Sequence, residues 1–166
     1  FSIEYFSHYK VLTVLKPWPG AKTSLRYVLV QCGTPDPPGY AGVPRIEIPV
    51  GRVVSMSTTQ LPHFEALNQL GSLVAVSDIK SVNSAAVNRL FDAGLVAQVG
   101  HGASVNLEGV LDLEPDLVMA VAMAQSQYNA HPVLEEAGVK VVVNAEYTEP
   151  SLLGRSEWLK FTASIF

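Results

Sequence analysis

Apolar residues change their spacing at Arg52, and the change divides the chain into two regions. From residue 52 to residue 144, short apolar runs alternate with segments in which apolar residues recur every three or four positions. The runs are rich in Val, Leu and Ala, which is typical of strands whose two sheet faces are both covered. The longer spacing indicates helices with one buried face. The pattern therefore predicts an α/β fold with a parallel βαβ sheet and helices on both faces.

Turn-forming residues bound each of these expected elements. Strands are expected over residues 53–56, 73–76, 96–99, 117–121 and 139–143. Helices are expected over residues 62–70, 84–91, 107–114 and 132–137, with Asn106 as a cap and with Gly71, Gly94, Pro115 and Gly138 as stops.

The region before Arg52 follows a different pattern. Aromatic and β-branched residues concentrate in residues 1–6, 11–18, 27–30 and 45–50. Pro19-Gly20 marks a turn, and the Pro- and Gly-rich residues 31–43 mark a loop. These signals predict an N-terminal antiparallel β-hairpin region.

The last part of the chain begins with a strand pattern and continues as a helix. Trp158, Phe161 and Ile165 recur at three- and four-residue spacing, which predicts one buried helix face. No Gly, Asn or Pro follows to end this helix. The pattern predicts that it reaches Phe166 and leads towards a further part of the protein.

Composition narrows the classes of function. The 166 residues are 48% hydrophobic and carry a net charge of −4, with Lys and Arg scattered along the chain. A nucleic-acid partner is not expected, because binding it requires a basic stripe. No apolar run approaches the roughly 18 residues that a membrane span needs. Cys32 is the one cysteine, so neither an intrachain disulfide nor a cysteine-based metal site is predicted. The His residues also lack metal-ligand spacing.

Candidate binding residues lie in the loops that follow the expected parallel strands. Ligands bind outside the carboxyl ends of the strands in open parallel sheets. These loops offer hydroxyl, amide, imidazole and phenol groups. The candidate ligand-binding residues are Thr58, Thr59, Gln60, Lys80, His101, Gln125, Gln127, Tyr128, Glu146 and Tyr147.

Each candidate also has a purely structural interpretation. Residues 57–59 precede a helix and suit an N-cap. The glycines around His101 suit a turn, because the segment lacks the Walker lysine and the full Rossmann glycine spacing. No G-x-S-x-G elbow is present, so no catalytic residue is predicted. An enzyme would need a phosphate loop or a metal-ligand cluster, and the sequence shows neither.

Four segments in this order resemble a known protein family. They are RVVSMSTTQ, LNQLGSLVAVS, VGHGASVNLEGVLDLEPDLVMA and HPVLEEAGVKVVVNAEYTEPSLLGRSEWLKF. Together they resemble one lobe of an ABC-importer substrate-binding protein. The branch is the one that captures ferric siderophores, haem or vitamin B12. The N-terminal segments YKVLTVLKPWPGA and YVLVQCG are similar to members of the same branch.

The resemblance implies a two-lobed protein with a ligand cleft between the lobes and a helix that links them. On this basis residues 1–51 are an N-terminal β-rich extension, and residues 52–150 are the α/β ligand-binding lobe. Residues 151–166 are the start of the inter-lobe helix, with the second lobe absent from this chain. The expected role is non-catalytic: a periplasmic protein, or an extracytoplasmic membrane-anchored lipoprotein, that delivers its ligand to a membrane permease.

The resemblance also implies a class of ligand and of partner. The transported ligand is expected to be a ferric siderophore, haem or cobalamin, and no cofactor is expected. Lys80 and Arg155 are the basic residues near the strand-end loops, which favours hydroxamate-type chelates or corrinoids over anionic catecholates. Family members dock on the permease through an acidic residue of each lobe, for which Glu135 and Glu136 are the candidates here.

A second interpretation needs no small ligand. The apolar content suggests that a lobe face is exposed, and such a face promotes pairing with a second copy of the chain. The protein would then be a non-catalytic interaction module that works as a homodimer or larger oligomer.

Overall fold

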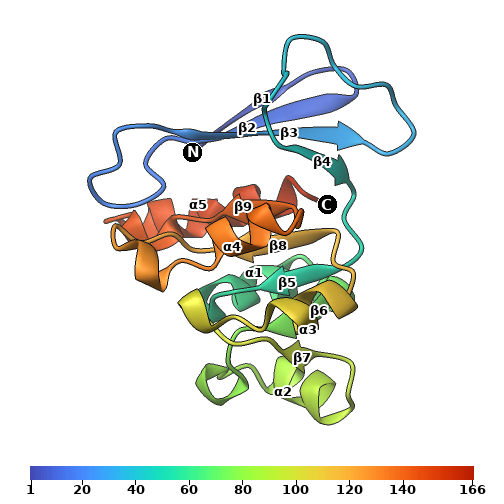
Figure 1. The fold of residues 1–166 in the computed structure, drawn as a ribbon, viewed down its shortest axis with the longest axis vertical. Coiled ribbons are helices and arrows are strands. Elements are labelled where there is room, and N and C mark those ends of the chain that lie inside the picture. The colour runs from blue at the N-terminus through green and yellow to red at the C-terminus, as the bar shows by residue number, and fades with distance from the viewer.

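The computed structural model describes residues 1–166, apart from the side chains of Ala103 and Ser126. It contains two sheets (Figure 1). The N-terminal sheet has the order β1 (Ser2–Tyr5), β2 (Tyr9–Val14), β3 (Leu25–Gln31) and β4 (Arg45–Ile48). The second sheet has the order β7 (Ala97–Gln98), β6 (Leu73–Val76), β5 (Val53–Ser55), β8 (Leu117–Ala120) and β9 (Val141–Val143).

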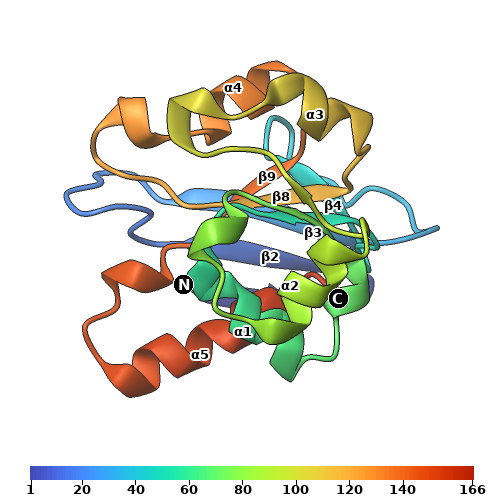
Figure 2. The same cartoon turned by 90° about the horizontal axis from the view of Figure 1, so that it is seen from below.

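All strands of the second sheet are parallel, as the alternating pattern predicts. Helices α3 (Leu107–Asp112) and α4 (His131–Glu136) cover one face, and α1 (Leu61–Ala66), α2 (Ala85–Asp92) and α5 (Leu152–Ala163) cover the other (Figure 2). Successive residues of β5 point to opposite faces, so Val53 packs towards α5 while Val54 packs towards α3 and α4. The predicted α/β fold class is confirmed.

The N-terminal sheet combines antiparallel and parallel pairing. β1, β2 and β3 are antiparallel, but β4 runs parallel to β3. The predicted antiparallel hairpin region is confirmed for β1, β2 and β3. The parallel pairing of β4 is an addition to it, because the loop of residues 32–44 is long enough to return the chain to the same end of the sheet. β4 also ends at Ile48 and not at Val50, since Pro49 has no N–H to donate to a ladder.

Helices α1 and α5 end three or more residues before the positions that their apolar spacing predicts. α1 stops at Ala66 because Asn68 adopts a left-handed conformation, with φ of 55°. α5 stops at Ala163, so the prediction that it reaches Phe166 is wrong. The N–H of Val50 donates to the carbonyl of Ile165 at 3.0 Å, and this bond turns the chain back onto the lobe.

One apolar core joins the two sheets. Strands β2, β3 and β4 direct alternate side chains onto α5 and onto the β8–β9 side of the second sheet. Trp158, Phe161 and Ile165 are buried in this core, as their spacing predicts. The N–H of Val143 donates to the Tyr27 hydroxyl at 3.0 Å, which ties β9 to β3. The Lys10 ammonium donates to the carbonyl of Ser164 at 3.0 Å.

Candidate functional site

The order of the parallel sheet creates a crevice between β5 and β8. Chain connections from these two neighbouring strands leave in opposite directions, since β6 and β7 lie on one side and β9 on the other. Ligands of open α/β sheets bind at such a switch point, outside the carboxyl ends of the strands. A pocket of about 390 Å³ occupies this position. Its lining residues are Met56, His101, Gly102, Ala120, Val121, Met123, Gln125, Tyr128 and Ala130.

Three of the sequence-predicted residues meet in this pocket. His101 follows β7, while Gln125 and Tyr128 belong to the loop after β8. Their side chains are exposed, and that of Tyr128 is 57% exposed. The imidazole, amide and phenol are therefore available to a ligand.

Glycines fix the loop that carries His101. Gly100 and Gly102 have φ of 80° and 54°, a region that favours glycine. A Cβ on Gly100 would lie 2.7 Å from the carbonyl oxygen of Ser104, and one on Gly102 would lie 3.3 Å from that of Tyr128. The Ser104 hydroxyl and N–H both donate to the His101 carbonyl, at 2.8 and 3.1 Å. The structural interpretation of these glycines as turn residues holds, and the turn sets His101 at the pocket wall.

The candidates after β5 have structural roles. Ser57 caps the 3₁₀ turn η1 (Thr58–Gln60), and its Oγ lies 2.8 Å from the Thr59 hydroxyl oxygen. Gln60 is fully buried, and its Oε1 accepts a hydrogen bond from the Ser55 hydroxyl at 2.7 Å. Neither threonine nor Gln60 lines the pocket. Gln60 therefore supports the end of β5 from within the lobe.

Glu146 and Tyr147 lie in the 3₁₀ turn η6 (Glu146–Thr148), after β9. Glu146 is buried, and its Oε1 has no hydrogen-bond partner among the described side chains and backbone. The Tyr147 hydroxyl donates to the Ala122 carbonyl at 2.7 Å, and burial raises the pKa of Tyr147. Tyr147 thus holds the start of the loop after β8, and later residues of this loop line the pocket.

Lys80 and Gln127 are exposed beside the pocket without lining it. Lys80 belongs to η3 (Ile79–Ser81), and its N–H donates to the Asp78 carboxylate. The Ser81 hydroxyl and this N–H lower the pKa of Asp78, with a smaller contribution from the charge of His101. Asp78 is therefore close enough to His101 for the two charges to interact at the pocket wall.

Sequence reasoning missed Met56 and Met123. Both residues line the pocket: Met56 directly follows β5, and Met123 lies in the loop after β8. The apolar pattern assigns Met56 to the strand itself. The order of the strands would have identified both, because residues that follow the two strands at the switch point must face the crevice.

The predicted docking residues lie at the other end of α4. Glu135 and Glu136 close this helix, whereas Ala130, which precedes it, lines the pocket. The surrounding groups desolvate Glu135 and raise its pKa. A role of either residue in permease docking stays a prediction.

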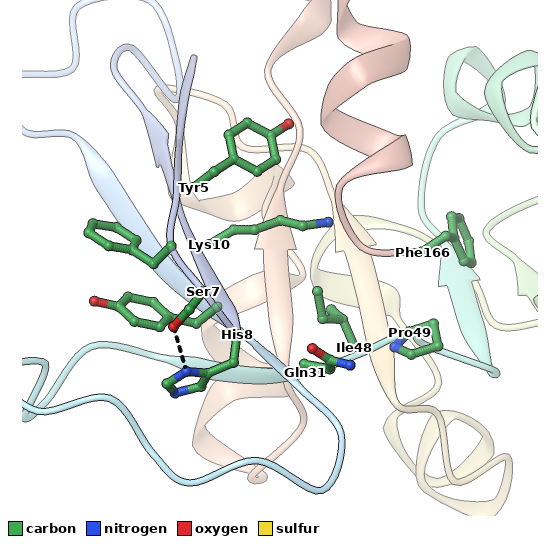
Figure 3. Close-up of a pocket in the computed structure, with 10 residues that line it drawn as sticks. Tyr5, Ser7, His8, Lys10, Gln31, Ile48, Pro49 and Phe166 are labelled. Atoms are coloured by element: carbon green, nitrogen blue, oxygen red, sulfur yellow. Dashed lines mark hydrogen bonds between the residues drawn. The ribbon is translucent and has the colours of Figure 1, made fainter.

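A separate hollow of about 280 Å³ lies at the end of the N-terminal sheet (Figure 3). Tyr5, Lys10 and His8 line it together with Phe166. The Phe6 and Tyr9 rings stack there at 4.4 Å, and the Lys10 ammonium is bound to the Ser164 carbonyl. This hollow shares no residue with the pocket at the carboxyl ends.

Across the described part of the chain, no three His, Cys, Asp or Glu side chains gather into a group that could hold a metal ion. None of the described helices has the length and apolarity to cross a membrane.

Known proteins share both the sequence pattern and the fold. Two uncharacterized lipoproteins of Methanocaldococcus jannaschii are 28% and 30% identical to the chain over 130 and 146 residues. The matches cover 73% and 85% of this chain, but 30% and 36% of those relatives. A crystal structure of a periplasmic haem-binding protein from Pseudomonas aeruginosa superposes with a TM-score of 0.50 at 24% identity, over 70% of this chain and 39% of that one.

The family match covers the α/β lobe and α5. The sequence model of the family described as periplasmic binding protein matches residues 53–166. It confirms the predicted family resemblance and the prediction that the protein is not an enzyme, because the family binds ligands without catalysis. The chain spans about a third of the length of its curated relatives. The protein belongs to the periplasmic binding protein family.

Proposed function

We propose that the protein is the extracytoplasmic solute-binding component of an ABC importer. It captures a ferric siderophore or a related iron chelate or corrinoid and delivers it to a membrane permease. The observation that carries this proposal is the pocket at the switch point between β5 and β8 in a chain of this family. In the whole protein a second lobe would close over this pocket.

The pocket chemistry favours one class of iron ligand. Its walls combine apolar side chains with two thioethers, an imidazole and a phenol. No Lys or Arg is among the residues that line it. Catecholate chelates carry a high negative charge and need charge-assisted hydrogen bonds from cations. Hydroxamate-type chelates, haem and corrinoids place less charge against the protein. The P. aeruginosa protein of similar fold binds haem, which belongs to the same class.

The proposed location follows from the family and from the relatives. The family supports a place outside the cytoplasm, and the two matched relatives are named lipoproteins. We therefore propose that the protein works in the periplasm or on a lipid anchor at the outer face of the membrane, where it meets its permease.

Native mass spectrometry tests the ligand class. The protein is mixed with a ferric hydroxamate, a ferric catecholate, haem and cobalamin, and retained complexes are identified by mass. We expect retention of the hydroxamate, haem or cobalamin and not of the catecholate. Absence of every complex, both from this chain and from a longer protein that includes the second lobe, would rule out these ligands.

Variants of the lining residues test whether the ligand binds in the pocket between β5 and β8. The double variant His101→Ala/Tyr128→Ala should weaken binding of the retained ligand by about tenfold, because it removes two polar contacts. The matched control, His8→Ala/Tyr5→Ala, changes the same residue types in the separate hollow. Equal loss of affinity in both variants would show that the ligand does not occupy the pocket between β5 and β8.

A further inference from the structure

A groove of about 480 Å³ separates the N-terminal sheet from the segment that joins α4 to β9. Its lining residues are Leu25, Arg26, Tyr27, Pro44, Arg45, Ile46, Glu135, Gly138, Val139, Lys140 and Val141. Figure 1 shows the elements that form it, with β3 and β4 on one side and α4 and β9 on the other. It shares no residue with the pocket at the carboxyl ends of the strands. The proposed function therefore leaves this groove unexplained.

Cations concentrate in this groove although the whole chain is acidic. The chain has a net charge of −4 and 11 Lys and Arg residues, and three of them, Arg26, Arg45 and Lys140, line the groove. Arg45 forms an ion pair with Asp36. Arg26 and Lys140 have no ion-pair partner among the residues that the structure describes. These two side chains are exposed and available to an anion.

The interior of the groove is apolar. Tyr27, Ile46 and Val141 are buried, and Leu25 and Val139 are half-buried beside them. The Tyr27 hydroxyl accepts the hydrogen bond from Val143, and burial raises the pKa of Tyr27, so its ring remains neutral. An apolar chain lying on the half-buried Leu25 and Val139 would remove their remaining apolar surface from water.

Glu135 is the one carboxylate that lines the groove. Desolvation raises its pKa, so it gains a proton more readily than an ordinary glutamate as the pH falls. When ionised, it repels an anion bound by Arg26 and Lys140. The groove should therefore bind anions more tightly at lower pH.

We propose that this groove binds an anionic amphiphile. A phosphate or carboxylate headgroup lies between Arg26 and Lys140, and the apolar chain lies on Leu25 and Val139. Arg suits this role because its planar guanidinium binds phosphate or carboxylate through two parallel hydrogen bonds. The site is distinct from the solute pocket, so the protein has two binding sites with different chemistry.

Calorimetric titration with a soluble probe tests the proposal. The probe is dihexanoyl phosphatidylglycerol below its micelle concentration, and the controls are dihexanoyl phosphatidylcholine and inorganic phosphate. We expect the phosphatidylglycerol to bind, and to bind more tightly than either control, because it alone combines a net negative charge with an apolar chain.

The double variant Arg26→Gln/Lys140→Gln should weaken binding by about tenfold, since it removes both unpaired cations. The variant Glu135→Gln should strengthen it by about threefold.

A matched variant controls for the loss of net charge. Lys16→Gln/Lys22→Gln removes two exposed cations outside the groove and should retain the affinity of the parent protein.

Sedimentation with phosphatidylglycerol vesicles then identifies the source of the ligand. Binding to vesicles indicates a membrane lipid, and binding to the soluble probe alone indicates a free amphiphile. Absence of binding to both, or equal weakening in the two double variants, would overturn the proposal. Retention of iron chelates or corrinoids is measured separately and does not depend on this groove.

Discussion

His63 joins two helices on one face of the lobe. Its Nδ1 lies 2.9 Å from the Thr162 hydroxyl oxygen, so α1 and α5 are connected through a half-buried ring. Desolvation lowers the pKa of His63, and the charge of Glu146 offsets part of this effect. Burial also lowers the pKa of His131. The fold thus favours the neutral form of both rings.

This preference makes stability depend on pH. The pKa of His63 is lower in the folded protein than in the unfolded chain, where it is about 6.5. Below that pH the unfolded chain binds more protons, so the free energy of unfolding decreases as the pH falls. Urea unfolding between about pH 7.5 and about pH 5.5 should show this decrease, with a slope of at most about 1.4 kcal/mol per pH unit for each titrating histidine.

The variant His63→Asn should have a shallower slope than the parent protein. His101→Asn is the control, because its ring is exposed. An unchanged slope in His63→Asn would show that the ring is not kept neutral by the fold.

Among single residues, the sequence predicted that His101, Gln125 and Tyr128 lie together at one end of the sheet, because the loops that follow parallel strands converge there. It could not predict that Gln60 is buried, since strand and helix periodicity does not report where a side chain at a turn points. Met56 was missed because an apolar residue after a strand has the same pattern as the strand.

Caps and turns set the bounds of the elements. Asn106 begins α3, and its Oδ1 accepts a hydrogen bond from the N–H of Gly109 at 3.0 Å. Ser151 begins α5 in the same way through Gly154, at 2.9 Å. The sequence predicted the Asn106 cap because Asn before a helical apolar pattern is a standard start signal.

Replacing this cap should destabilise the lobe. Asn106→Ala leaves the N–H of Gly109 without its partner, and we expect the free energy of unfolding to fall by about 1 kcal/mol. Asn83→Ala is the matched control, because Asn83 is exposed and Ser84 caps the following helix. Thermal and urea unfolding of both variants measure the difference. A loss of equal size in Asn83→Ala would contradict the capping role.

Elements were harder to predict where long-range contacts decide the outcome. The parallel pairing of β4 depends on the path of residues 32–44, and local propensity does not specify it. The early end of α5 depends on the bond between Val50 and Ile165, which are far apart in the sequence. By contrast, the buried strands and their order of alternation with helices follow from apolar spacing, which is a local property.

The whole molecule is organised around the core that joins its two sheets. Phe161 is fully buried there and packs edge-to-face on Phe1, while residues of β2, β3 and β4 surround it. This core includes residues from all three segments expected from the sequence, namely 1–51, 52–150 and 151–166. We therefore expect these segments to unfold together.

Two probes of unfolding test this expectation. Tryptophan fluorescence reports on Trp158, which is buried in the core, and on the half-buried Trp18, while circular dichroism reports on the helices of the lobe. Their urea transitions should coincide. Phe161→Ala should lower the free energy of unfolding by about 3–5 kcal/mol and shift both transitions equally. Separate transitions would show that the N-terminal sheet and the lobe are independent folding units.

The hydrogen bond between Val143 and Tyr27 also bears on how the protein avoids aggregation. An edge strand of a sheet has unpaired backbone N–H and C=O groups, so it can pair with an extended chain of another molecule. At β9 the N–H of Val143 is occupied by the Tyr27 hydroxyl, and β3 is tied over this border. At the opposite border, β7 spans Ala97–Gln98 and offers little length for pairing. Both edge strands of the parallel sheet therefore offer few free backbone groups, and we expect them to be poor templates for intermolecular β-structure.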